Sequence, residues 1–134
     1  MTIKELSQLR YLGREIEMDR RRLKELETMA TSLASPNMDG MPHAPGYGDK
    51  IAGCVAEIVD LQAIIAAKQQ QCLYERNRLE RYIASVPDSL TRQIMTLRFV
   101  DGKSWAAVAM TIGGGNTEDG VKKICYRYVN QEPA

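Results

Sequence analysis

Large aromatic residues are scarce in this sequence, which has one Trp and one Phe among 134 residues. Its apolar residues are mostly Leu, Ile, Val, Ala and Met, a composition that favours packed helices over a β-sandwich. No apolar run approaches the roughly 18 residues that a membrane span requires, so we expect no membrane as a partner. With 44% hydrophobic and 26% charged residues, the chain is typical of a folded protein rather than a disordered one.

An excess of one charge is also missing. The net charge is +1, with 12 basic and 12 acidic residues in 1–85 and 6 basic and 5 acidic residues in 86–134. Composition alone therefore does not indicate a nucleic-acid partner. Any affinity for DNA must come from the local placement of cations, and we expect it to be modest for a monomer.

Side chains suited to catalysis or metal binding are few. Cys54, Cys72 and Cys125 have no CxxC spacing, and we expect them to be buried, reduced thiols of a cytosolic protein. His43 is the single histidine and has no second metal ligand at a suitable spacing. The sequence contains no nucleophile–base pair and no phosphate-binding glycine motif followed by Lys and Ser or Thr. We therefore predict no enzyme, no catalytic residue, no metal, no cofactor and no small-molecule substrate.

A heptad repeat predicts one long helix over residues 2–34. Its two apolar positions are filled by Leu9, Ile16, Leu23 and Ala30 and by Leu12, Leu26 and Leu33. Asp19 is the exception to the pattern. The exposed charges beside the stripe, including Arg20, Arg21 and Arg22, predict a solvated helix face rather than a DNA patch.

A Pro/Gly-rich loop at 35–48 ends this helix, and a second helix is predicted from Asp49 to about Ala84. A second heptad repeat runs through Ile51, Ile58, Ile65, Cys72 and Leu79, and Val55, Leu61, Tyr82 and Ile83 widen the stripe. Its polar middle, residues 68–71, weakens the seam and is a place where register or partner choice can be set.

The expected fold is therefore all-α. A long N-terminal antiparallel helical hairpin, coiled-coil-like, occupies residues 1–85, and a three-helix helix-turn-helix domain occupies residues 86–134. The two stripes can close on each other or on those of a second chain. Because two helices bury only one face each, we expect the hairpin to be a dimerisation region.

Three shorter helices are predicted in the C-terminal segment, at 88–100, 104–112 and 117–130. Asp88 or Ser89 can cap the first and Ser104 the second, and the glycines at 113–115 end the second helix. The expected core is Leu90, Ile94, Leu97, Trp105, Val108, Ile112, Val121, Ile124 and Tyr128. We expect Trp105 to be a core anchor rather than a ligand platform.

The last helix has a polar face that points to DNA recognition. The candidate DNA-binding residues are Asn116, Thr117, Glu118, Asp119, Lys122, Lys123, Tyr126 and Arg127. Asn116 or Thr117 can cap the helix, and the turn can hold a phosphate. Lys122, Lys123 and Arg127 can contact phosphate or guanine, whereas the two acids favour the positive end of the helix.

The string SLTRQIMTLRFVDGKSWAAVAMTIG, residues 89–113, resembles the fourth region of sigma-70 family factors. The matching residues are Arg92, Leu97, Arg98, Phe99, Gly102, Trp105, Val108, Ala109 and Ile112. The whole chain is similar, more loosely, to phage and prophage transcriptional regulators of the RinA-like and ArpU-like kind. The triple-glycine turn and the acids at the start of the last helix depart from the usual sigma pattern.

This resemblance implies a sequence-specific DNA-binding transcriptional regulator of phage or prophage late genes. Its partners would be double-stranded DNA and a second copy of the chain, with RNA polymerase as a further candidate. It would act in the cytoplasm of a bacterial host, on DNA. Two alternatives stay open, namely a small-terminase-like DNA-packaging protein and a coiled-coil protein-interaction adaptor.

Overall fold

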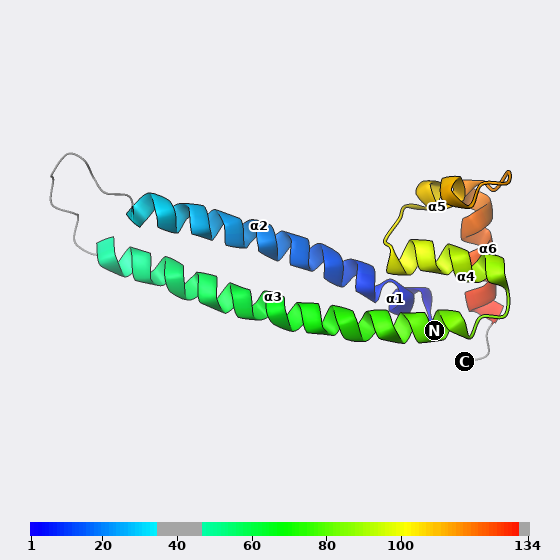
Figure 1. Cartoon of the computed structure of the whole chain (residues 1–134), viewed down its shortest axis with the longest axis horizontal. Helices are drawn as coiled ribbons and strands as arrows, with labels where there is room; N and C mark the ends of the chain where they lie inside the picture. Colours follow the sequence, from blue (N-terminus) through cyan, green and yellow to red (C-terminus); the bar gives the residue numbers. More distant parts are fainter. Residues whose placement is uncertain (35–46, 132–134) are drawn as a thin grey trace. The chain divides into compact units, whose positions relative to one another are not determined.

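The computed structural model describes residues 1–34 and 47–131, and within them it contains only helices (Figure 1). The α-helices are α1 (Ile3–Leu6), α2 (Gln8–Ala34), α3 (Tyr47–Ala84), α4 (Ser89–Met95), α5 (Trp105–Ile112) and α6 (Glu118–Gln131). A π-helical segment, η1 (Thr96–Val100), continues α4. The predicted all-α class is confirmed, and so is the long helix pair followed by shorter helices. No helix of the described segments is long and apolar enough to cross a membrane.

The first predicted helix is interrupted once, at Ser7. Thr2 caps α1, since its hydroxyl accepts from the Glu5 backbone N–H at 3.2 Å and the Glu5 carboxylate accepts from the Thr2 backbone N–H at 3.2 Å. The Ser7 hydroxyl then donates to the Ile3 carbonyl at 2.8 Å. The apolar periodicity did not predict this break.

Helices α2 and α3 form an antiparallel pair (Figure 1). Buried stripe residues include Leu12, Ile16 and Leu26 on α2 and Cys54 and Ile65 on α3. The prediction that Val55 widens the stripe is wrong, because its side chain is 48% exposed. One residue turns a helix by about 100°, so Cys54 occupies the seam and Val55 lies beside it.

The polar exceptions in the two stripes meet each other. The Lys68 ammonium group donates to the Asp19 carboxylate at 2.6 Å and lies 3.5 Å from the Glu15 carboxylate. The Lys68 and Asp19 side chains are 26% and 22% exposed, so water reaches both. The hydrogen bond with Asp19 raises the pKa of Lys68. Because only one alignment of the helices brings these groups together, the pair fixes the register of the hairpin.

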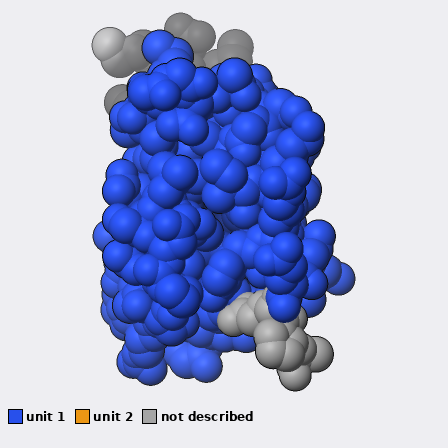
Figure 2. All heavy atoms as spheres, turned by 90° about the vertical axis from the view of Figure 1, so that its right-hand side faces the viewer, with its two compact units in different colours: residues 1–13, 71–134 blue, residues 14–70 orange. Residues whose placement is uncertain are grey.

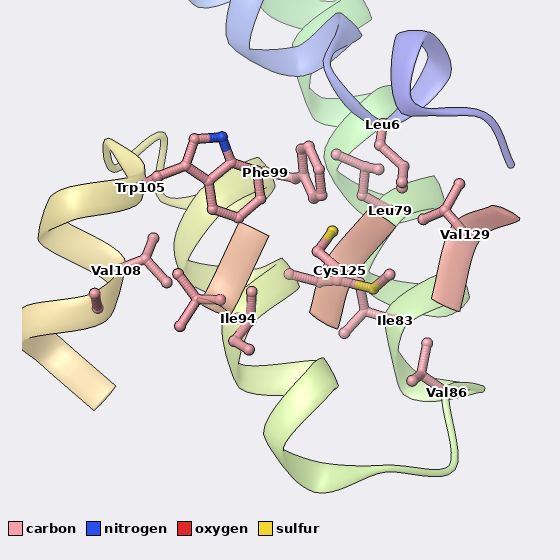
Figure 3. Close-up of a cluster of buried hydrophobic side chains, with 13 residues drawn as sticks. Leu6, Leu79, Ile83, Val86, Ile94, Phe99, Trp105, Val108, Cys125 and Val129 are labelled. Atoms are coloured by element: carbon pink, nitrogen blue, oxygen red, sulfur yellow. The ribbon is translucent and has the colours of Figure 1, made fainter. Parts of the chain in front are cut away.

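Contacts divide the chain into two compact units, residues 14–70 and residues 1–13 with 71–134. The surface of the latter fills the face in Figure 2. Its core, shown in Figure 3, combines the short helices with ends of the chain's long ones. The buried residues are Leu6, Leu79, Ile83, Val86, Ile94, Met95, Phe99, Trp105, Val108, Ala109, Val121, Cys125 and Val129. Leu6, Leu79 and Ile83 thus share a core with residues beyond the boundary predicted at 85/86.

The short helices begin where capping residues are present. The Asp88 carboxylate accepts from the Thr91 backbone N–H at 3.1 Å and from its hydroxyl at 2.6 Å, and these hydrogen bonds lower the pKa of Asp88. The Ser104 hydroxyl accepts from the Ala107 N–H at 3.2 Å. The expected helix 88–100 is therefore present from Ser89, although its last five residues are π-helical. Predicted core residues Ile94, Trp105, Val108 and Val121 are buried, whereas Leu90, Leu97, Ile112, Ile124 and Tyr128 are partly buried.

Replacing both Asp19 and Lys68 with Leu makes the α2–α3 seam continuously apolar. We expect the double variant to unfold at a higher urea concentration than the wild type. Each single Leu variant should unfold at a lower concentration than the double variant, because it leaves one partly buried charge without its main partner. Circular dichroism during urea titration measures the midpoints. Single variants as stable as the double variant would show that the two charges are not coupled.

Candidate nucleic-acid interface

Helix α6 is held by three side chains spaced four residues apart, which are Val121, Cys125 and Val129. Val121 and Cys125 are fully buried, and burial raises the pKa of the Cys125 thiol to about 12. The thiol is therefore an apolar packing group rather than a nucleophile. This buried row fixes the rotation of α6, so the opposite side of the helix faces solvent.

Trp105 supports the same helix from α5. Its ring meets the edge of the Phe99 ring with centroids 6.3 Å apart and that of Tyr126 with centroids 6.0 Å apart. Trp105 is 9% exposed, which confirms its predicted role as a core anchor (Figure 3). Tyr126 is half-buried by this contact, so among the candidate residues it lies at the edge of the core rather than on the open face.

The turn between α5 and α6 uses three consecutive glycines with positive φ. Gly113, Gly114 and Gly115 have φ values of 68°, 63° and 80°. Gly113 also has ψ of −151°, a combination that is essentially restricted to glycine. The Asn116 side-chain amide donates to the Gly113 carbonyl at 2.8 Å and closes the turn. The side chain of Asn116 is therefore engaged in the turn itself.

Thr117 begins the second helix of this pair. Its hydroxyl accepts from the Gly120 backbone N–H at 3.0 Å, so Thr117 is the cap and Asn116 is not. A Cβ at position 120 would lie 2.9 Å from this hydroxyl oxygen, which explains a glycine inside the first turn. Glu118 and Asp119 follow in that turn, where acidic groups stabilise the positive end of the helix.

The open side of α6 is mostly cationic. Lys122, Lys123 and Arg127 are exposed, and they line a shallow depression together with Asp119, Tyr126, Asn130 and Gln131. Sequence reasoning did not include Asn130 and Gln131, although they lie one helical turn beyond Tyr126 and Arg127 and so share their face. Both amide side chains are suited to hydrogen bonding with bases or phosphates.

The charged side chains on this side of α6 differ in whether they contact another side chain. The Lys123 ammonium group lies 2.8 Å from the Asp119 carboxylate, and this hydrogen bond lowers the pKa of Asp119. Both side chains are well exposed, so the pair contributes little to stability and can exchange for another anion. The Lys122 ammonium group lies 5.6 Å from the Tyr126 ring centroid. Within residues 1–34 and 47–131, Arg127 has no ion-pair partner.

Two arginines of the sequence motif in residues 89–113 have structural contacts. The Arg92 guanidinium donates to the Val86 and Pro87 carbonyls at 2.7 and 3.0 Å, where the chain leaves α3. The Arg98 guanidinium donates to the Lys103 carbonyl at 3.0 Å and lies 4.7 Å from the centroid of the Trp105 ring. Both cations thus hold loops in place, and the exposed cations of residues 86–131, namely Lys122, Lys123 and Arg127, all lie on α6.

No family model, curated protein or solved structure matches this chain. In the part of the chain that the structure describes, no three His, Cys, Asp or Glu side chains are grouped to hold a metal ion. His43 and the loop around it lie outside the described residues.

Gly113→Ala is expected to lower the free energy of unfolding by about 1–3 kcal/mol, because alanine is strained in the backbone conformation of this turn. Gly13→Ala is a matched control within α2, where nothing lies within 4 Å of the added Cβ. That change should raise the free energy of unfolding by about 0.5–1 kcal/mol through improved helix propensity. Urea unfolding measures both. A Gly113→Ala protein as stable as the wild type would contradict the strained turn.

Proposed function

We propose that this chain is a sequence-specific DNA-binding protein that regulates transcription and reads DNA with α6. The observation that carries the proposal is the exposed cationic side of α6, opposite a row of buried residues that fixes the helix. A recognition helix needs both properties, because its side chains must reach base edges while its backbone keeps a constant orientation in the major groove.

In this proposal α5, the glycine turn and α6 are a helix-turn-helix, and α4 with η1 completes its three-helix domain. The resemblance of residues 89–113 to the fourth region of sigma-70 family factors supports this interpretation. The phage-regulator resemblance adds late-gene control as the biological role.

The candidate residues then have different roles. Lys122, which lies over the Tyr126 ring, and Arg127 can reach guanine or phosphate, whereas Lys123 must exchange its partner Asp119 for a phosphate. Asn116 and Thr117 act mainly through the geometry of the turn, because their side chains are engaged there. The backbone N–H groups at the start of α6 can still face a phosphate.

The small number of cations limits the affinity of one module. Three exposed cations on α6 neutralise few phosphates, so binding by a single module should be weak and sensitive to salt. Two modules joined in a homodimer would bind two half-sites and gain specificity. A dimer also separates this proposal from a packaging protein, for which we expect a ring of subunits.

Lys122→Ala combined with Arg127→Ala is expected to abolish sequence-specific binding and to leave the helical content unchanged. DNA selected by the wild-type protein from a random pool serves as the probe. Fluorescence anisotropy should show an affinity loss of at least about tenfold, since one good base contact alone contributes about 1–3 kcal/mol of discrimination. Circular dichroism checks the fold.

The matched control is Arg21→Ala with Lys24→Ala, which removes the same charge from the exposed side of α2. Its affinity for the selected DNA should stay within about threefold of the wild type, since neither residue belongs to the proposed reading helix. Specific binding that survives the Lys122/Arg127 change would exclude α6 as the reading element.

A further inference from the structure

One acidic side chain lies inside the cationic depression on α6. Asp119 lines this depression together with Lys122, Lys123 and Arg127, whereas Glu118, the other acid of the first turn, does not. The four lining residues lie close to whole turns apart along the helix, so they share one side of α6. A surface that served only to attract phosphate would gain nothing from a carboxylate in this position.

The Asp119 carboxylate is hydrogen-bonded to one of these cations. It accepts from the Lys123 ammonium group at 2.8 Å, and this hydrogen bond lowers the pKa of Asp119, so the acid is ionised at neutral pH. The acid precedes the lysine by four residues, which is the favourable order for an ion pair on a helix. The backbone of α6 therefore keeps the carboxylate within reach of Lys123 whenever the helix is formed.

Support of the helix start does not by itself account for an acid at position 119. The Thr117 hydroxyl already caps the helix, and Glu118 already places a negative charge in its first turn. The Asp119 and Lys123 side chains are 74% and 62% exposed, so their ion pair adds little to the stability of the fold. The same exposure leaves Lys123 open to an anion from solution, with which Asp119 must compete.

We propose that Asp119 is an internal competitor for DNA phosphate, which occupies Lys123 and thereby weakens the sequence-independent binding of duplex DNA by α6. This inference rests on the proposed function. A carboxylate oxygen and a phosphate oxygen accept the same charge-assisted hydrogen bond from a lysine ammonium group. A phosphate that binds Lys123 must therefore displace the carboxylate and remain beside it, where the two negative charges repel each other.

The competition acts mainly on binding that does not depend on sequence. Asp119 offsets the charge of one of the three cations in the depression and leaves Lys122 and Arg127 to attract DNA. Contacts with phosphate supply essentially all of the sequence-independent affinity but only a share of the affinity for a recognised site. Because other sequences compete with that site in large excess, a carboxylate that weakens phosphate contacts favours discrimination by the reading helix.

Asp119→Asn removes the charge and nearly keeps the shape of the side chain, so it should release Lys123 for a phosphate. The affinity of the full-length chain for a duplex of arbitrary sequence should rise about three- to tenfold at roughly 0.1 M salt. The slope of log affinity against log salt should steepen by about 0.9, the contribution of one further phosphate. Fluorescence anisotropy measures both quantities between roughly 50 and 200 mM salt.

Glu118→Gln is the matched control, because it removes the same charge from the same turn of α6. Among the residues that the structure describes, Glu118 has no ion-pair partner, so this change releases no cation. The number of neutralised phosphates is then unchanged, so the slope should equal that of the wild type and the affinity should stay within about twofold. Circular dichroism should show the same helical content in both variants.

Removal of Lys123 tests whether the effect passes through the ion pair. In a Lys123→Ala background there is no cation to release, so Asp119→Asn should change the affinity no more than Glu118→Gln does. An Asp119→Asn effect of equal size with and without Lys123, or one no larger than that of Glu118→Gln, would overturn the proposal. A lower affinity of Asp119→Asn would also overturn it, since the carboxylate would then contact DNA itself.

Elution from heparin separates failure of this inference from failure of the proposed function. Asp119→Asn and Glu118→Gln have the same net charge, so a later elution of Asp119→Asn reports the release of Lys123 to a sulfated polyanion. Equal elution of the two variants would contradict the internal competition and leave α6 as a reader of DNA. Later elution of Asp119→Asn, from a chain that selects no DNA sequence, would support the competition and exclude sequence-specific recognition.

Discussion

The Asp19 carboxylate and the Lys68 ammonium group lie 2.6 Å apart in the middle of two otherwise apolar seams. Each would be unfavourable in a seam without the other, so only one alignment of α2 on α3 satisfies both. That alignment closes the heptad stripes inside one chain. It therefore decides which surfaces remain for other molecules, because neither stripe is left for a partner.

The exposed surface of the hairpin differs between its two helices. The free side of α2 is charged, and water covers it at little cost. Helix α3, by contrast, exposes the apolar side chains of Val55 and Val59 beside the seam. In the C-terminal helices the same logic applies at a smaller scale, since the buried row of α6 leaves a cationic side exposed. Both exposed surfaces thus follow from which side of a helix the core uses.

Much of the fold was predictable from local sequence patterns. Heptad spacing predicted both long helices, and the capping residues Asp88, Ser104 and Thr117 lie within one residue of the predicted starts of the short helices. The break at Ser7, the exposed side of Val55 and the shared core of Leu6 with Val121 were not predicted. The exposure of Val55 and the shared core depend on how the helices pack and on contacts between residues distant in sequence, and the apolar pattern of a single helix encodes neither.

The candidate site also shows what sequence patterns alone do not predict. Residue type identified every cation of α6, but it did not tell which polar groups the fold itself uses. Asn116 closes the turn, Thr117 caps the helix, Asp119 holds Lys123 and Tyr126 packs on Trp105. Because the fold already uses these four side chains, Lys122 and Arg127 are the candidate residues most available to a ligand. In the proposed DNA-binding role two such groups would give a weak and salt-sensitive reader, so specific recognition would require two modules in a fixed arrangement.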